Sequence, residues 1–368
     1  MKARVLAYYL PQYHPIPEND EWWGKGFTEW TNVAKAKPLF RGHWQPHLPA
    51  DLGFYDLRVP EIREAQAVLA RNHGIEGFIY YHYWFGDGRR LLERPFNEVL
   101  SSGEPDFPFC LCWANHTWSG VWYGETDRIL MQQCYGGRKD YTKHFEALLP
   151  AFEDKRYIRI DDKPLFQVLI PKDIPDPAEF TDTFRELAQA NGLPGLFIVA
   201  TVDDEKELKA FDYDACVSNG FNIGLRKLLN GTHLTAHRVL QSRILGERLR
   251  NLLGSQVPKI DYQELINEMK LDGHFSYELI PCVVPNWDNT PRSGPRGTVV
   301  TGSTPKLFEK HLQNAVDYVQ KYPEARRLVF IKSWNEWAEG NYLEPDSEFG
   351  LDYLEAVRRV VCSSKQSS

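Results

Sequence analysis

Two glutamates near the end of the chain have the type and spacing for acid–base chemistry. Glu336 and Glu339 lie three residues apart in a segment that also holds Trp334 and Trp337. Hydrolysis of a glycosidic bond needs one carboxyl group that protonates the leaving oxygen and a second group that acts at the anomeric carbon. On a continuing strand the two side chains would face opposite ways, so we expect a turn after Trp334, which Gly340 permits. The sequence predicts these two glutamates as the catalytic carboxylates.

Aromatic and polar side chains gather at the ends of several expected strands. In an α/β barrel the reactive groups lie just past the carboxyl ends of the strands, where the loops form a concave face. Aromatic rings beside amide, imidazole and carboxylate groups suit a sugar, which has apolar C–H faces and a rim of hydroxyls. The expected partner is therefore a carbohydrate, an oligosaccharide or a polysaccharide. The predicted substrate-binding residues are Tyr8, Tyr9, His14, Trp30, His82, Trp84, Trp113, Asn115, His116, Trp118, Asn286, Trp287, Asp288, Arg292, Trp334, Asn335 and Trp337.

The elements that must position these residues are short apolar runs that alternate with helical segments. This alternation favours a parallel sheet covered by helices, and eight runs predict a (β/α)₈ TIM barrel. The expected strands are 4–10, 77–83, 107–114, 165–170, 196–201, 215–218, 279–284 and 328–333. The expected helices, from apolar residues at helical spacing, are 59–72, 141–152, 180–190, 307–319 and 351–361.

One stretch of the chain, 221–275, does not follow this alternation. It holds a basic helical pattern at 237–253 and a second pattern at 262–270. We interpret the stretch as a helical insertion on the barrel rather than as a separate domain. The prediction is one catalytic domain over 1–368 with a frayed C-terminus at 363–368, since barrels with elaborated loops commonly exceed about 250 residues.

Charge and metal-ligand patterns exclude several classes of protein. The formal net charge of −7 argues against nucleic acid, because phosphate binding needs clustered Lys and Arg. The six cysteines indicate no disulfide framework, and none of them has the paired spacing of a zinc site. His43 and His47 have i, i+4 spacing, but Pro46 argues against a helix there. No metal and no cofactor are expected.

The N-terminus and the hydropathy bear on location. The start of the chain is too short and too aromatic for the apolar region of a signal peptide, and no run approaches the roughly 20 apolar residues of a membrane span. We expect a cytoplasmic protein; a chain whose leader had been removed would look the same.

Several segments resemble a known family of carbohydrate enzymes. Residues 334–340, followed by 343–345, resemble the catalytic E-x-x-E segment of glycoside hydrolase family 99. Residues 7–14 and 23–30 are more similar to the family 99-like branch of bacterial polysaccharide gene clusters, which often carries the label of WbsX-type glycosyltransferases, and 285–292 fits that branch too. The motifs extend from the first expected strand to the last.

This resemblance implies a barrel and retaining hydrolysis of an α-mannosidic bond. The implied base is Glu336, which removes the proton of the sugar's own 2-hydroxyl so that a 1,2-anhydro sugar forms, and the implied general acid/base is Glu339. Such ring closure needs the 2-oxygen anti to the leaving group, as in α-mannose and α-rhamnose. Ala338 departs from the better-known endomannosidases, in which a larger polar residue is expected. The expected substrate is thus a manno-configured sugar, of mannose or rhamnose type, in a bacterial surface polysaccharide such as the O-antigen of lipopolysaccharide.

Two alternatives remain open at this point. A glycosyltransferase of polysaccharide assembly could use the D-x-D triplet 212–214 to hold a metal-bound nucleotide sugar, yet this triplet precedes an expected strand instead of following one. A non-catalytic carbohydrate-binding protein could keep the same aromatic residues. The intact glutamate pair argues against it, because binding alone does not require two carboxylates so close together.

Overall fold

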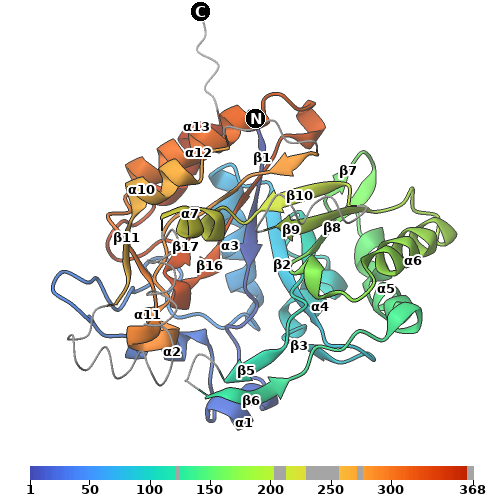
Figure 1. Ribbon diagram of the computed structural model, residues 1–368, viewed down its shortest axis with the longest axis horizontal. Coiled ribbons are helices and arrows are strands. Elements are labelled where there is room, and N and C mark those ends of the chain that lie inside the picture. The colour runs from blue at the N-terminus through green and yellow to red at the C-terminus, as the bar shows by residue number, and fades with distance from the viewer. Residues whose placement is uncertain (121–124, 203–212, 229–256, 272–276, 363–368) are drawn as a thin grey trace, which may run out of the picture.

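Parallel strands form a barrel in the middle of the molecule (Figure 1). The computed structural model describes residues 1–120, 125–202, 213–228, 257–271 and 277–362. Neighbouring strands pair in the order β12-β10-β9-β8-β4-β2-β1-β15-β13. In chain order these segments are β1 (Arg4–Tyr9), β2 (Gly77–Trp84), β4 (Phe109–Trp113), β8 (Lys163–Val168), β9 (Phe197–Val202), β10 (Ala215–Ser218), β12 (Leu279–Ile280), β13 (Cys282–Val283) and β15 (Leu328–Ile331).

The strand expected over 279–284 is divided at Pro281. Its first half, β12, pairs with β10, and its second half, β13, pairs with β15. Proline has no N–H to donate, so the ladder is interrupted there, while the Pro281 carbonyl still accepts a hydrogen bond from the Phe330 N–H at 2.9 Å. With the two halves counted as one strand, the sheet nearly closes on itself and the predicted (β/α)₈ barrel is confirmed.

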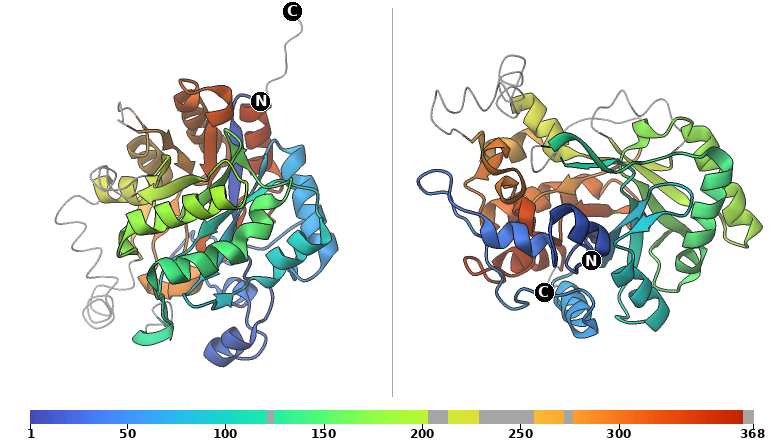
Figure 2. Two further views of the ribbon diagram at one scale, coloured as in Figure 1. Left: turned by 90° about the vertical axis from the view of Figure 1, so that its right-hand side faces the viewer. Right: turned by 90° about the horizontal axis from the view of Figure 1, so that it is seen from below.

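Helices cover the outside of the barrel, with α5 and α6 on one side and α12 and α13 on another (Figures 1 and 2). Among the described residues, no helix is both long enough and apolar enough to cross a membrane. The principal helices are α3 (Pro60–Asn72), α4 (Arg94–Ser102), α5 (Gly137–Glu153), α6 (Pro177–Ala190), α7 (Gly220–Leu228), α12 (Pro305–Val319) and α13 (Asp352–Val361). The shorter elements are α1 (Pro17–Trp23), α2 (Glu29–Lys35), β3 (Arg90–Leu91), β5 (Trp118–Gly120), β6 (Glu125–Met131), β7 (Arg159–Ile160), β11 (Lys259–Asp261), α10 (Tyr262–Glu268), α11 (Thr290–Ser293), β14 (Val299–Thr301), β16 (Asn335–Glu336), η6 (Trp337–Glu339) and β17 (Asn341–Tyr342).

Two of the expected helices begin earlier than their apolar pattern indicates. The Asp176 side chain accepts a hydrogen bond from the Glu179 N–H at the start of α6, and Thr304 accepts one from the Leu307 N–H at the start of α12. A proline follows each cap, at the first helical position, where its missing N–H costs nothing. Capping chemistry, and not the first apolar residue, therefore sets where these helices start.

The strands alternate between the interior of the barrel and its helix-covered outside. Tyr8 of β1 stacks on Tyr81 of β2 inside the barrel, with ring centroids 5.5 Å apart. Tyr80, one position earlier, instead packs against Phe96 of α4 at 5.3 Å. All eight residues of β2 are buried, so burial alone does not distinguish its two faces.

Part of the stretch interpreted as an insertion lies among the described residues. α10 (Tyr262–Glu268) agrees with the helical pattern expected at 262–270, and it packs against α7 and α12. β11 pairs with β14, and Tyr262, Leu265 and Ile266 form a small apolar cluster with residues of these elements. The basic pattern at 237–253 lies outside the described residues.

Candidate active site

Three carboxylates converge on one buried guanidinium. Arg292 Nη2 lies 3.1 Å from Glu336 Oε2, its Nη1 lies 2.5 Å from Glu339 Oε1, and its Nε lies 3.0 Å from Glu29 Oε2. The side chain of Arg292 is 5% exposed, that of Glu29 0%, that of Glu336 7% and that of Glu339 15%. A fully used guanidinium fork holds carboxylates in fixed positions, so Arg292 sets the geometry of the predicted catalytic pair.

The turn expected after Trp334 brings the two glutamates to the same side. Glu336 ends β16, and residues 337–339 form the 3₁₀ turn η6. Gly340 then adopts a left-handed conformation with φ of 58°. A Cβ atom at this position would lie 2.9 Å from both the backbone N and the Cβ of Asp288. Gly340 is required for its conformation and for this close approach.

Loops from opposite ends of the chain supply the site. Glu29 opens α2 in the loop after β1, Arg292 lies in α11 after β13, and the glutamate pair follows β15. α2, α11 and η6 pack against one another, and the view from below in Figure 2 shows N-terminal and C-terminal segments side by side at this end of the barrel. Because parallel strands all end on the same side, residues 263 positions apart, Glu29 and Arg292, meet there.

Burial and neighbouring charge make Glu336 an unusual carboxyl group. Burial first, and then the negative charge of Glu339, raise the pKa of Glu336 to about 7, against the opposing effects of Arg292 and Lys332. The ammonium of Lys332 lies 3.9 Å from Glu339 Oε2. Three carboxylates thus face two cations, and a single proton would balance the cluster.

Two tyrosines of β2 face this cluster from inside the barrel. Burial, and next the charge of Glu336, raise the pKa of both Tyr81 and Tyr83, so each keeps its phenolic proton. Both lie within the second expected strand, 77–83, but they are not among the predicted binding residues. Their hydroxyls are donors that a sugar or a carboxylate could use.

Three predicted binding residues face away from the carboxylates, against helix α5. His82 Nε2 lies 2.9 Å from His144 Nε2, and the ring of Trp84 stacks on His144 at 4.7 Å. Trp113 Nε1 donates to the Trp84 carbonyl at 3.0 Å. Burial lowers the pKa of both histidines, so the pair is neutral. The structure does not bring these residues to the site, because strand alternation places them on the outer face.

Tyr9, Trp334 and His14 are also packed away from the pair. The Tyr9 hydroxyl donates to Gln66 of α3 at 2.6 Å, on the outer face of β1. Trp334 is fully buried, with its ring 5.0 Å from Phe78. His14 is buried too, and burial lowers its pKa against the charge of Asp56. None of the three contacts Glu336 or Glu339 in the part of the chain that the structure describes.

Two predicted asparagines join neighbouring loops. Asn115 accepts from the Ile170 N–H and donates to the Ile170 carbonyl, both at 2.8 Å. Asn335 accepts from the Leu10 N–H at 2.7 Å and donates to the Leu10 carbonyl at 3.1 Å. Each side-chain amide thus pairs with the backbone N–H and C=O of a residue just past the end of a strand. These two residues therefore hold in place the loops that carry the site.

Asp288 has a similar supporting position. Its Oδ2 accepts from His43 and Gln45, each at 2.7 Å, and its Oδ1 accepts from the backbone N–H and the hydroxyl of Thr290. Burial acts to raise its pKa, but these hydrogen bonds outweigh that effect and lower it. Its backbone N–H donates to the Glu339 carbonyl at 2.6 Å. Asp288 therefore fixes the backbone beside the carboxylate pair.

Trp337, which lies between the two glutamates in the chain, packs against Trp30 of α2. Their rings lie 5.5 Å apart, and Trp337 also stacks on Tyr342 at 3.8 Å. Trp337 Nε1 donates at 2.6 Å to Glu344, whose carboxyl group also accepts from Gln66 and Tyr55. Burial raises the pKa of Glu344 to about 7.

The remaining predicted residues lie at the same end of the barrel. The ring of Trp118 contacts Tyr83 edge to face at 5.0 Å. The ammonium of Lys332 lies 5.2 Å from the ring of Trp287, so this half-buried ring borders the charged cluster, and Asn286 precedes it. Burial lowers the pKa of His116, and Lys332 lowers it further against Asp173. Tyr8 lines the interior beside Tyr81.

Sequence reasoning missed Glu29 and Lys332. Glu29 lies within a motif used for the family resemblance, and Lys332 directly follows β15, where barrel enzymes place reactive groups. Position in the chain was the available signal for Lys332. No spacing in the sequence indicates a role for Glu29, because its partner, Arg292, lies 263 positions away and reaches it only in the folded chain.

Asp214 of the D-x-D triplet lies at the other end of the strands. Asp214 Oδ2 accepts from the Ile198 N–H at 2.9 Å and from Arg185 at 3.0 Å, just before β10 begins. Asp212 is outside the described residues. Among those described, no group of three His, Cys, Asp or Glu side chains has the arrangement of a metal site. Asp214 therefore joins the loop before β10 to β9 and α6.

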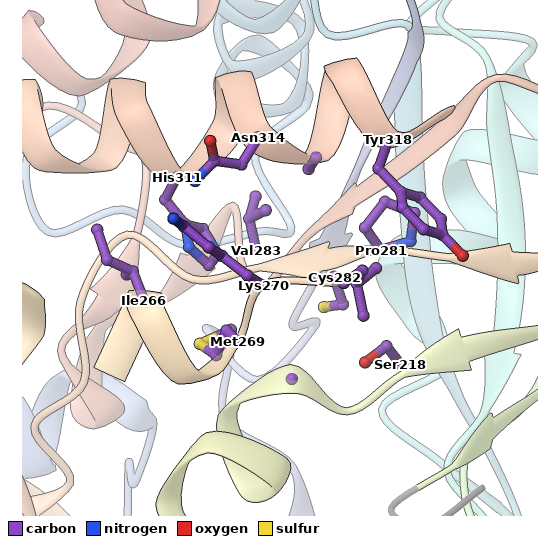
Figure 3. A pocket seen from close by; sticks show the side chains of 13 residues that line it. Ser218, Ile266, Met269, Lys270, Pro281, Cys282, Val283, His311, Asn314 and Tyr318 are labelled. Atoms are coloured by element: carbon purple, nitrogen blue, oxygen red, sulfur yellow. The ribbon is translucent and has the colours of Figure 1, made fainter. Parts of the chain in front are cut away.

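A small cavity opens between β13, α10 and α12, away from the carboxylates (Figure 3). Its volume of about 30 Å³ corresponds to one or two water molecules and excludes a sugar ring. Met269, Cys282 and His311 point into it.

The overall fold is that of family 99 glycoside hydrolases. A protein described as glycoside hydrolase-like superposes with a TM-score of 0.59 at 15% identity, covering 98% of this chain and 94% of its own. The GH99 endo-alpha-mannosidase from Bacteroides thetaiotaomicron, in complex with bis-tris-propane, superposes with a TM-score of 0.57 at 14% identity, covering 98% and 96%. At this identity the likeness concerns the fold alone.

The sequence itself defines the family. Residues 5–357 match the family described as Glycosyltransferase WbsX, and the chain belongs to it. The uncharacterized protein WxcX of Xanthomonas campestris pv. campestris, in strains ATCC 33913 and B100, is 36% identical over 364 residues. This match covers 98% of the chain but 50% of WxcX, so the chain spans about half the length of these curated relatives.

Proposed function

We propose that this protein is a retaining glycoside hydrolase that cleaves α-linked manno-configured sugars, of mannose or rhamnose type, in a bacterial polysaccharide. The observation that carries the proposal is the convergence of Glu336 and Glu339 on Arg292, with one of the two carboxyl groups buried enough to have a pKa of about 7. The endo-alpha-mannosidase fold supports the choice of sugar.

In the proposed reaction the two carboxyl groups exchange protons with the sugar. Glu336 takes the proton of the 2-hydroxyl while O2 bonds to the anomeric carbon, and Glu339 gives its proton to the leaving oxygen as the glycosidic bond breaks. Water then attacks the anomeric carbon and passes a proton to Glu339, while Glu336 returns its proton to O2. Two inversions at the anomeric carbon give net retention.

The raised pKa suits the role of base. A carboxylate whose conjugate acid has a pKa of about 7 accepts a proton more readily than an ordinary carboxylate does. Arg292 keeps both carboxyl groups in place through the two steps, and Lys332 lies near enough to offset negative charge on Glu339.

A glycosyltransferase is the second candidate, favoured by the description of the family. It differs from the hydrolase in needing an activated donor. Asp214, the described member of the D-x-D triplet, is occupied by protein partners at the opposite end of the strands, which supports the hydrolase instead.

Incubation with an α-mannan or an α-rhamnan, with and without nucleotide sugars, tests both candidates. A hydrolase shortens the glycan without a donor and releases product whose first-formed anomer is α, as read by NMR. Product that forms only with a donor would establish the transferase and overturn the proposal. Glu146→Gln, an exposed carboxylate on α5, serves as the control for charge removal.

A further inference from the structure

A second hollow lies next to the carboxylate cluster. It has a volume of about 350 Å³ and is lined by the loop at 40–47, by Asn286 and Asp288, by β14 and by residues 348–353. This volume falls in the range of pockets that bind small molecules, about 300 to 1,000 Å³. It admits a sugar ring, unlike the cavity of Figure 3.

Aromatic side chains form one wall of this hollow. Trp44 stacks on His47 with ring centroids 3.8 Å apart, and Phe349 meets Trp44 edge to face at 5.7 Å. Trp44 and Phe349 are both half-buried. His47 is held in place by the Trp44 carbonyl and the Tyr342 hydroxyl. The wall is a rigid aromatic surface of the kind on which the C–H face of a sugar packs.

The hollow is also lined by polar groups. Asn286 Oδ1 is buried and has no hydrogen-bond partner among the described residues. This oxygen is closed to solvent, so the polar groups that a ligand in the hollow can reach are other lining side chains. Thr301 and Glu348 add a hydroxyl and a carboxylate at the lining. Asp288 and His43 are already paired, and the Thr301 hydroxyl donates to the Ile260 carbonyl at 3.3 Å. The Thr301 oxygen and the Glu348 carboxylate remain as acceptors, which suits a neutral ligand with several hydroxyls.

Asp288 connects the hollow to the catalytic pair. Its carboxylate receives His43 and Gln45 from the loop on the hollow side, while its backbone N–H donates to the Glu339 carbonyl at 2.6 Å. Gly340 packs directly against it. Asp288 therefore lines the hollow on one side and contacts the turn that carries Glu339 on the other.

We propose that this hollow is an accessory subsite that binds one neutral sugar ring of the polysaccharide, at a distance along the chain from the bond that is cleaved. The inference rests on the proposed function for the identity of the polymer, but not on cleavage. Trp44 provides the stacking surface, and the exposed Glu348 carboxylate at the lining accepts from a sugar hydroxyl.

The test compares binding of long and short fragments of the polymer to protein that carries Glu336→Gln, so that nothing is cleaved. Trp44→Ala removes the stacking surface, and Thr301→Trp fills the hollow while leaving the Trp44–His47 contact intact. Both are expected to lower the ratio of long-fragment to disaccharide affinity, measured by calorimetry, by about tenfold. Val68→Ala, on the exposed side of α3, is the control and keeps the ratio.

A second readout separates this inference from the proposed function. Free mannose or rhamnose at millimolar concentration is expected to shift the indole N–H signal of Trp44, assigned from its loss in Trp44→Ala, even if no glycan is ever shortened. Unchanged affinity ratios in both variants, or a Trp44 signal that neither sugar moves, would overturn the subsite. If the wild-type protein cleaves no glycan while free sugar still shifts the Trp44 indole signal, only the proposal of a hydrolase is overturned.

Discussion

Replacing Glu29 with glutamine tests whether Arg292 organises the site. The change keeps the shape of the side chain but removes the charge that faces the Arg292 Nε at 3.0 Å. Both side chains are almost fully buried, so water does not replace the lost partner. Removing one partner of a buried pair costs about 3 to 5 kcal/mol, and an isosteric amide that still accepts a hydrogen bond belongs at the low end, about 3 kcal/mol.

The expected effect on unfolding follows from the size of the chain. With an unfolding entropy of about 2.1 cal/mol/K per residue, a loss of about 3 kcal/mol lowers the Tm by roughly 4 °C. Differential scanning calorimetry of Glu29→Gln against wild type measures it. Glu146→Gln, with an exposed side chain, is expected to leave the Tm within about 1 °C, because surface substitutions change stability by at most about 0.5 kcal/mol.

The same substitution is expected to change the pH dependence of activity. The charge of Glu29 is among the causes that raise the pKa of Glu336, after burial and Glu339. Its removal also leaves Arg292 with more positive charge to stabilise the Glu336 carboxylate. Both effects lower the pKa of Glu336, so the acidic limb of kcat/KM moves to lower pH. A variant with wild-type Tm and an unmoved acidic limb would refute the view that Glu29 acts through Arg292.

Four further predictions concern the pair and its support. Glu336→Gln and Glu339→Gln are each expected to reduce hydrolysis by a factor of about 10² to 10⁴, measured as reducing ends; activity near that of wild type in either would remove that residue from the mechanism. For wild type, kcat/KM is expected to rise as the pH increases through about 7, since Glu336 must be ionised to act as base; a fall over the same range would assign it as the acid instead. Folding raises the pKa of Glu336 and Glu344 from 4.5 to about 7, so the folded state binds more protons than the unfolded state between these values, and stability falls as the pH rises from 5 to 7. Glu344→Gln removes one of these groups and is expected to make the Tm fall less steeply over this pH range. A slope equal to that of wild type would contradict the raised pKa of Glu344. Gly340→Ala is expected to lower the free energy of unfolding by about 1 to 3 kcal/mol and to reduce kcat, because the φ of 58° and the 2.9 Å approach to Asp288 leave no room for a methyl group. Denaturant unfolding measures the first effect, and wild-type kcat in the folded variant would argue against a fixed turn.

The order of strands and helices was predictable from local pattern. Short apolar runs separated by helical periods recur along the chain, and the structure places a strand at each of them, with the run at 279–284 divided because Pro281 cannot donate to the ladder. Boundaries were less predictable, because capping side chains such as Thr304 begin helices before the first apolar residue.

What the amino-acid sequence determined by itself is the barrel and the glutamate pair with its turn, since both depend on residues close together in the chain. Tertiary structure alone decided which side chains reach that pair. His82 and Tyr83 are adjacent in a strand that is buried on both faces, so hydrophobicity carries no sign of which one points inward. The Glu29–Arg292 pair spans 263 positions and forms because parallel strands deliver distant loops to one end of the barrel.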